Sequence, residues 1–347
     1  MNATMRAVML NAPGDIELVE TAVPVPGNGE VLLKVAACGV CGSDLARMLK
    51  KGAWKLPLVC GHEFSAWVSE LGPGVTEVAV GDLVTVPPMI PCGQCPPCVQ
   101  GHYSLCEDYD YYGSRRHGAY AEYVAGPAKL LLKVPADLDP RAAAMVDPAA
   151  IALHAIWRTK LRHGHRVAVI GGGGPIGLFA IQWARLAGAT EVVAIDVSPD
   201  KLRLATLAGA DNGVAPAEVA AICGRGFDVV IECSGHPAAE DQAVGITARH
   251  GDAVFIGIPN ADVRISDANW ARFMRLEINL IGAWNSFSAP FPGAEWTTSV
   301  AMMHSGALKW EFMITHELPL SKVAQTIKAM GDRTIHSSKV LFLPELG

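Results

Sequence analysis

The sequence predicts an α/β fold in two domains, one a doubly wound parallel sheet and the other an irregular, β-rich, barrel-like domain. A chain of 347 residues is long enough for two domains with substantial cores. Strand and helix patterns alternate from about 151 to 286. Residues 1 to about 90 show short strand patterns separated by proline–glycine turns. We therefore assign 151–286 to the parallel-sheet domain, and 1–150 together with 287–347 to the β-rich domain.

The composition favours a compact cytoplasmic enzyme. Half of the residues are hydrophobic, 18% are charged and 35 are glycine. A net charge of −6 without a lysine or arginine run argues against nucleic acid and anionic membranes as partners. The start, MNATMRAVML, lacks the apolar core of a signal peptide, and the longest uncharged run is too glycine-broken to span a membrane. In that compartment the nine cysteines are expected to be metal ligands or buried thiols.

The β-rich domain carries four closely spaced cysteines. Their order is Cys92-x-x-Cys95-x-x-Cys98-x7-Cys106, and four thiolates at this spacing predict a tetrahedral zinc site. The site would be structural, because no position is left open for a substrate. Two other readings are iron–sulfur ligation, whose bacterial ferredoxin gaps differ from these, and a pair of disulfides, which the cytoplasm disfavours.

Cys41 and His62 remain as possible ligands once the four-cysteine site is filled. A catalytic zinc usually has three protein ligands and one open position. The gap between the two residues means that only folding could bring them together. Taken singly, Cys41 is better explained as a buried thiol, and His62 as a core histidine bonded to a backbone carbonyl.

The parallel-sheet domain begins with a predicted helix at Asp147-Pro148, because proline suits the first helical position. Strands are expected at 167–171, 191–195, 228–233, 253–257 and 278–282. Ser198-Pro199 is a suitable cap and first turn for the helix that follows the second strand. The apolar strand Asn279–Ala283, at the last position of the sheet, is available to pair with a second subunit, so we expect a homodimer or homotetramer.

The segment from Val167 to Asp196 predicts a dinucleotide site. A strand, a glycine turn, an amphipathic helix and a second strand ending on Asp196 follow one another in the expected order. The G-x-G-x-x-G motif contains Gly172, Gly174, Pro175, Ile176 and Gly177. Its glycines permit a tight turn and close approach of a pyrophosphate to the helix N-terminus, and Asp196 is placed to accept hydrogen bonds from ribose hydroxyls. A glycine-rich turn without a ligand is the alternative. We expect the cofactor to be NAD, since no arginine follows Asp196 to pair with a 2′-phosphate.

Several motifs together resemble the zinc-dependent medium-chain alcohol and polyol dehydrogenases over essentially the full length. They are CGVCGSD, GHEFSAWV, GDLV, the four-cysteine lobe, DPAAIALHA and GGGPIG. The resemblance implies a catalytic zinc, and therefore two zinc ions per chain. Its implied ligands are Cys41, His62 and Asp147. Glu63 would be an alternating ligand or a neighbour of the metal, Ser43 would begin the proton path from the substrate alcohol, and Lys201 would reach the ribose.

The chain departs from the family pattern at two positions. The third ligand is usually glutamate or cysteine, whereas this chain has Asp147, which is one methylene shorter than glutamate and would reach the metal directly or through water. The other reading of Asp147 is an N-cap for the helix begun by Pro148. Five residues after the first ligand, where the family has a histidine that relays the proton, this chain has Ala46. The proton would therefore leave Ser43 through water or a cofactor hydroxyl.

Two stretches, SRRHGAYAEY and GAWNSFSAPFPGAEW, further resemble family members that act on phosphorylated sugar alcohols. Arginine's planar fork suits bidentate contact with phosphate, which makes Arg115 and Arg116 candidate substrate residues. The alternative is a solvated turn whose arginines bridge surface carboxylates. By the same resemblance Glu122, Trp284 and Asn285 would line the polyol end.

The expected activity is zinc-dependent, NAD-linked oxidation of a secondary hydroxyl of a sugar alcohol or sugar-alcohol phosphate to the ketose. One alternative is an unphosphorylated polyol or another secondary alcohol, such as threonine, as the substrate. The other is a non-catalytic nucleotide-binding protein, whose mark would be loss of the open metal site. Cys41, Ser43 and His62 are all present, which disfavours that reading.

Overall fold

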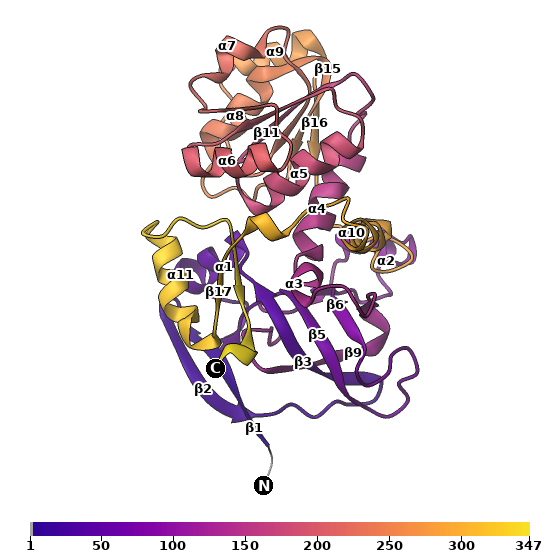
Figure 1. Ribbon diagram of the computed structural model, residues 1–347. Helices are drawn as coiled ribbons and strands as arrows, with labels where there is room; N and C mark the ends of the chain where they lie inside the picture. Colours follow the sequence, from indigo (N-terminus) through magenta and orange to yellow (C-terminus); the bar gives the residue numbers. More distant parts are fainter. Residues whose placement is uncertain (1–2) are drawn as a thin grey trace. The chain divides into compact units, whose positions relative to one another are not determined.

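The structure, a computed structural model, describes residues 3–347, which form two compact units (Figure 1). Unit 1 comprises the residues up to Asp147, Phe287–His304 and Ile314–Gly347, and unit 2 comprises Pro148–Ser286 and Ser305–Met313. The predicted two-domain α/β fold class is confirmed. Among the helices of residues 3–347, none is both long enough and apolar enough to cross a lipid bilayer.

Unit 2 is built on a six-stranded parallel sheet in the order β13-β12-β11-β14-β15-β16. Its strands are β11 (Arg166–Ile170), β12 (Glu191–Ile195), β13 (Asn212–Val214), β14 (Phe227–Glu232), β15 (Thr247–Phe255) and β16 (Asn279–Gly282). β11 and β12 are apolar and buried almost throughout, as strands covered on both faces must be. The five strands predicted from the sequence are present, and the short β13 is an addition. From β11 the chain adds β12 and β13 on one side of the sheet and then β14, β15 and β16 on the other. Open parallel sheets bind ligands at such a switch point, here between β11 and β14.

Helices connect the strands of unit 2. They are α4 (Val146–Trp157), which begins in unit 1, α5 (Pro175–Leu186), α6 (Pro199–Leu207), α7 (Val219–Cys223), α8 (Pro237–Ile246) and α9 (Asp267–Leu276), with a 3₁₀ turn at Glu311–Met313. α6 starts as its sequence predicts, because the Ser198 hydroxyl accepts a hydrogen bond from the Lys201 N–H and Pro199 takes the first helical position. α4 begins one residue earlier than expected, at Val146.

Unit 1 contains mostly antiparallel strands. A seven-stranded sheet has the order β10-β6-β5-β3-β18-β17 with β9 also paired to β3, and two smaller sheets are β2-β1-β4 and β7-β8. The strands are β1 (Thr4–Ala12), β2 (Asp15–Ala22), β3 (Glu30–Gly39), β4 (Leu58–Val59), β5 (Glu63–Leu71), β6 (Leu83–Val86), β7 (Met89–Ile90), β8 (Asp110–Tyr111), β9 (Tyr123–Pro127), β10 (Leu132–Lys133), β17 (Ile314–Leu318) and β18 (Lys339–Phe342). One continuous core of buried side chains, including Phe64, Tyr120 and Phe342, lies among them.

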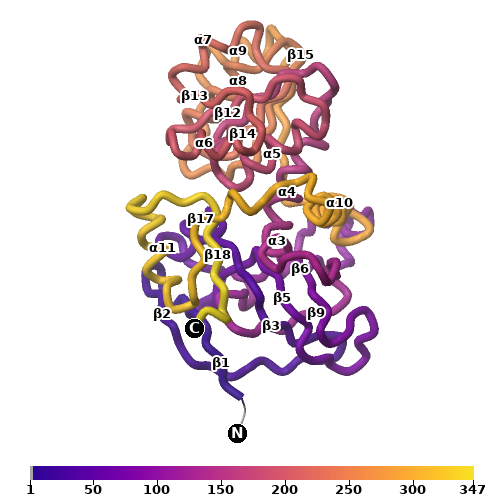
Figure 2. Tube along the Cα trace, in the orientation of Figure 1, coloured from indigo at the N-terminus to yellow at the C-terminus, as the bar shows by residue number. Residues whose placement is uncertain are grey.

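The C-terminal residues complete the sheet begun by the N-terminal ones. β18 pairs with β3 in the register Leu341↔Gly39 and Phe342↔Cys38, so the end of the trace runs beside residues 300 positions earlier (Figure 2). The helices of unit 1 are α1 (Gly42–Ala46), α2 (Pro96–Val99), α3 (Pro140–Ala143), α10 (Ala294–His304) and α11 (Val323–Gly331). Single helical turns occur at Arg47–Lys51, Tyr103–Leu105, Ala128–Leu130, Leu320–Lys322 and Pro344–Leu346. The β3–β18 pairing places residues from both chain ends around one site.

Candidate metal centres and dinucleotide site

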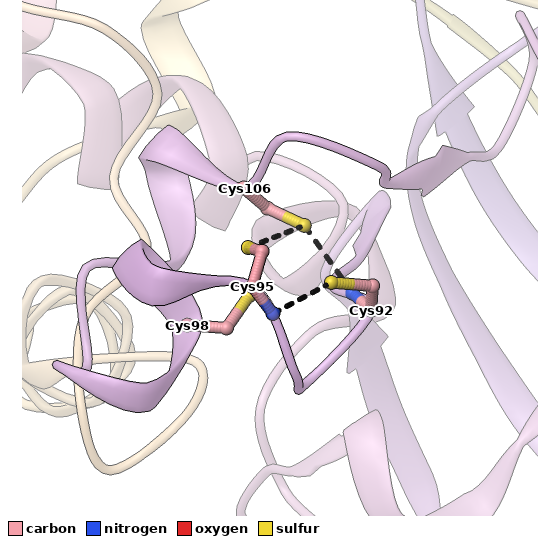
Figure 3. A group of neighbouring side chains, drawn as sticks. All are labelled: Cys92, Cys95, Cys98 and Cys106. Atoms are coloured by element: carbon pink, nitrogen blue, oxygen red, sulfur yellow. Dashed lines mark hydrogen bonds between the residues drawn. The ribbon is translucent and has the colours of Figure 1, made fainter.

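The four predicted zinc thiols of unit 1 lie together (Figure 3). The sulfurs of Cys92, Cys95, Cys98 and Cys106 are all within 4.8 Å of one another. Those of Cys95 and Cys106 are 3.9 Å apart, close to the ~3.8 Å that a tetrahedron of 2.3 Å Zn–S bonds requires. The backbone N–H groups of Gln94 and Cys95 lower the pKa of Cys92 to about 6, which favours the thiolate. All nine cysteines are free thiols, and this group of four fits a closed zinc site.

A second group brings Cys41, His62 and Glu63 together, with ligand atoms within 4.8 Å of one another. The pairing of β3 with β5 explains how a 20-residue gap closes, because it sets Gly39 opposite Glu63. Cys41 follows the end of β3 as the N-cap of α1, and His62 immediately precedes β5. His62 and Glu63 are each 3% exposed. These residues form an incomplete ligand set that leaves room for further ligands.

Asp44 lies against the His62 ring, a contact that the sequence reasoning missed. Its Oδ1 lies 3.3 Å from His62 Nδ1, which leaves Nε2 free for a metal. Tyr120 and the Cys41 N–H donate to the Asp44 Oδ2, and Arg47 donates to Oδ1. Burial alone would raise the pKa of Asp44, but His62 and Arg47 lower it to about 2. The signal in the sequence is an acid three residues after Cys41, in CGSD.

Glu63 forms a buried ion pair with Lys339, the first residue of β18. Lys339 is 0% exposed and its Nζ also lies 3.4 Å from the Val40 carbonyl oxygen. Burial acts to lower the pKa of Lys339, but the Glu63 carboxylate outweighs this and the pKa is raised. Gly39 makes space for the pair, because a Cβ there would lie 2.6 Å from Lys339 Cε. No local motif identifies Lys339, which lies 276 residues from Glu63.

Asp147 lies in the first turn of α4 and is 4% exposed. α4 begins at Val146, so Asp147 lies within its first turn rather than before it. Burial and the neighbouring Glu63 charge raise the pKa of Asp147 to about 7, against the opposing effects of His62 and Lys339. The charges of the second group therefore act on the Asp147 carboxylate. Its oxygens, however, are not among the ligand atoms of that group, which lie within 4.8 Å of one another.

Ser43 lies in α1, two residues after Cys41 and partly exposed, and Ala46 ends the same helix. The helix therefore offers a hydroxyl beside the second group but no histidine to pass a proton onward. The Tyr111 ring also contacts that of His62, with ring centroids 5.7 Å apart. Burial, followed by the charge of Asp147, raises the pKa of Tyr111 well above its usual range. Sequence reasoning did not single out Tyr111.

The glycine turn of unit 2 joins β11 to α5, whose N-cap is Gly174 and whose first residue is Pro175. Gly177 allows the helix to approach the strand, because a Cβ there would lie 2.4 Å from the Gly171 carbonyl oxygen. Asp196 follows β12, and its Oδ2 accepts a hydrogen bond from the Gly173 N–H at 3.1 Å. Ile176 and Gly172 complete the turn, which lies at the carboxyl ends of neighbouring strands. The geometry fits a dinucleotide pyrophosphate and ribose.

The candidate substrate residues have separate partners. In unit 1, Glu122 pairs with Arg6, and Arg116 lies 3.7 Å from Glu30 and 3.6 Å from Asp110. Arg115 stacks on aromatic rings instead. In unit 2, Trp284 is 50% exposed, and Asn285 has a φ of 54° and a buried Nδ2 with no hydrogen-bond partner. Asparagine tolerates this backbone conformation well, and the unpaired buried amide leaves Asn285 a candidate for binding a ligand.

Comparison with known proteins identifies both halves of the chain. Residues 27–136 match the family model described as the alcohol dehydrogenase GroES-like domain, and residues 175–304 match the zinc-binding dehydrogenase model. Galactitol 1-phosphate 5-dehydrogenase of Escherichia coli K12 is 34% identical over 98% of this chain and 100% of its own. L-threonine 3-dehydrogenase of Bacillus velezensis is 33% identical over 99% and 100%.

Solved structures agree with these relatives. The crystal structure of galactitol-1-phosphate dehydrogenase from Escherichia coli superimposes with a TM-score of 0.92 at 34% identity, covering 98% of this chain and 100% of that chain. A protein from Sinorhizobium meliloti described as a zinc-binding dehydrogenase, bound to NADP, gives a TM-score of 0.89 at 32% identity, covering 99% and 100%. The similarity thus spans both units.

Proposed function

Because this chain belongs to the zinc-dependent medium-chain dehydrogenases and is an alcohol or polyol dehydrogenase, we propose that it oxidises a secondary hydroxyl of a polyol or polyol phosphate to the ketose with NAD. The observation that carries the proposal is the incomplete ligand set of Cys41, His62 and Glu63. It differs from the closed four-cysteine group in leaving positions for a substrate oxygen. A protein that only bound nucleotides would have no need to keep such a set.

We propose that two zinc ions bind per chain. Cys92, Cys95, Cys98 and Cys106 would hold the structural ion. Cys41 and His62 would hold the catalytic ion with Asp147 as the third ligand, while the ion pair with Lys339 restrains Glu63 as an alternating one. Zinc at such a site lowers the pKa of a coordinated hydroxyl, as it does for water.

The residues around that site would move the proton and fix the geometry. Asp44 keeps the His62 ring in one orientation, so that the metal-facing nitrogen is presented without rotation. Ser43 would accept the substrate hydroxyl proton and, because Ala46 cannot relay it, pass it to water or to a cofactor hydroxyl. The nicotinamide would receive the hydride, and the protein's part is to position the two reactants.

The surroundings of Asp196 support NAD over NADP. Both of its oxygens are already engaged, Oδ2 by the Gly173 N–H and Oδ1 by the Ser198 N–H, which fixes the carboxylate at the end of β12. A 2′-phosphate would meet this fixed negative charge, and the next residue, Val197, offers no compensating cation. Lys201 lies on α6 beside the turn, where a Cβ on Gly173 would meet its side chain, and would contribute to ribose binding.

We also propose that the chain forms a homodimer or homotetramer through β16. This strand is the last of its sheet, so one edge of its backbone is unpaired in the described structure. Exposed apolar side chains lie on and near it, Leu280 on the strand and Trp270 and Met274 on α9. Sedimentation velocity should show a dimer or larger species, and a monomer at micromolar concentration would reject the proposal.

The experiment that tests the activity is a substrate panel. Hexitols, hexitol phosphates and L-threonine would be assayed with NAD and with NADP, following formation of the reduced nicotinamide. Preferred oxidation of a polyol or its phosphate with NAD supports the proposal. Preference for L-threonine would instead favour the activity of its L-threonine 3-dehydrogenase relatives. If none of these alcohols is oxidised, the proposed dehydrogenase function on them is refuted.

A further inference from the structure

Arg115 is held between two aromatic rings. Its guanidinium carbon lies 4.5 Å from the centroid of Trp54 and 4.1 Å from that of Tyr109. One nitrogen, Nη1, donates a hydrogen bond to the Tyr109 carbonyl oxygen at 2.8 Å. The stacking fixes the plane of the guanidinium, while Trp54 is 77% exposed, so this arrangement reaches the surface. A guanidinium fixed in this way is pre-organised to bind a planar or tetrahedral anion.

The two arginines differ in how their charge is balanced. Arg116 lies within 4.0 Å of two carboxylates, those of Glu30 and Asp110, and over the ring of Tyr112. No carboxylate of residues 3–347 lies within that distance of the Arg115 nitrogens. Arg115 therefore keeps a charge and free N–H donors for an external anion, whereas Arg116 already has internal partners.

Ring contacts connect Arg115 to the second metal group. Tyr109 packs edge-on against Tyr111 with centroids 6.1 Å apart, and Tyr111 contacts His62 at 5.7 Å. The steps of 5.7, 6.1 and 4.1 Å limit the separation between the His62 ring and the Arg115 guanidinium to about 16 Å. The separation therefore does not exceed what a six-carbon polyol with a terminal phosphate, together with its contacts at each end, can bridge. All of these residues belong to unit 1.

From this geometry we infer that Arg115, held by Trp54 and Tyr109, is the specificity-determining residue that binds a phosphate monoester on the substrate. The hydroxyl to be oxidised would lie at Cys41 and His62, and the phosphate at the other end of the chain of rings. The inference rests on the proposed dehydrogenase function and narrows its substrate class to polyol phosphates. It also separates Arg115 from Arg116, which the sequence treats as equivalent neighbours.

The test compares kcat/KM for a hexitol phosphate with kcat/KM for the free hexitol in the zinc-loaded, full-length enzyme. The wild type should prefer the phosphate ester. Arg115→Ala should lower this preference by about 10- to 100-fold, the value of a lost charged contact, chiefly through KM for the ester. Arg115→Lys should fall between the two, because it keeps the charge without the planar fork.

Two matched variants control for the loss of one positive charge. The exposed Arg158→Ala should change the preference by no more than about twofold, and Arg116→Ala should change it far less than Arg115→Ala does. Thermal unfolding of each variant separates loss of fold from loss of specificity. An unchanged preference in folded Arg115→Ala, or an equal fall in Arg116→Ala, would overturn the inference.

The wild type also separates this inference from the proposed function. If it oxidises hexitol and hexitol phosphate equally well, the phosphate role of Arg115 is wrong and the polyol dehydrogenase stands. If it oxidises neither, the proposed function itself fails.

Discussion

Lys339→Met should destabilise the zinc-free protein strongly. The lysine is fully buried, Glu63 is 3% exposed, and removing one partner leaves the other charge buried without compensation. Breaking a buried ion pair in this way costs about 3–5 kcal/mol. For a unit of this size each kcal/mol lowers Tm by about 2–4 °C, so a fall of roughly 10 °C is expected. Zinc should recover part of the loss, because Glu63 could then turn to the metal.

The assay is thermal unfolding followed by circular dichroism, with and without a chelator. Lys51→Met removes the same charge from an exposed position and should change stability by no more than about 0.5 kcal/mol. Lys339→Arg keeps the charge and should lie nearer the wild type. A zinc-free Lys339→Met protein that unfolds at the wild-type temperature would show that the pair does not compensate the Glu63 charge, and our account of the site would be wrong.

Three further predictions concern the other groups. Cys95→Ser should unfold or aggregate the protein, because a closed zinc site contributes folding free energy; normal solubility and Tm would argue against a structural zinc. Asp196→Ala should narrow the preference for NAD over NADP mainly by weakening NAD, and steady-state kinetics showing equal use of both cofactors by the wild type would reject the assignment. Asp147→Asn should abolish most activity if the carboxylate ligates zinc, and unchanged kcat/KM would remove Asp147 from the catalytic set. The pKa of Asp147 is about 7 in the folded protein and near 3.9 in the unfolded chain. The zinc-free wild type should therefore lose stability as pH rises from about 4 to about 7, because the unfolded chain releases this proton first. Asp147→Asn should reduce that loss when thermal unfolding is measured across this pH range.

The parts of the fold that sequence reasoning predicted are those that depend on short stretches of chain. The glycine turn, the strands of unit 2 and the cap at Ser198 are decided by residues close together in the sequence, and the structure has them where expected. The four-cysteine lobe is local in the same sense. β13 has only three residues, too few to show a period, which explains why it was not predicted.

The parts that sequence reasoning missed depend on strand pairing between distant residues. Lys339 meets Glu63 only because β18 pairs with β3, a register that no local pattern specifies. Glu122 likewise meets a remote partner, Arg6, and one of the two carboxylates beside Arg116, that of Glu30, is also distant in the sequence. Asp44 is the exception, since its position in CGSD could have indicated a residue that orients a metal ligand.

We propose that two ligand sets of different closure hold two zinc ions, of which only one is catalytic. Measuring zinc per chain together with activity in the wild type and in Cys41→Ser tests it most directly. We expect two zinc ions in the active wild type, and one in a folded, nearly inactive Cys41→Ser protein. A fully active wild type containing a single zinc, or a Cys41→Ser protein that keeps both zinc and activity, would contradict it.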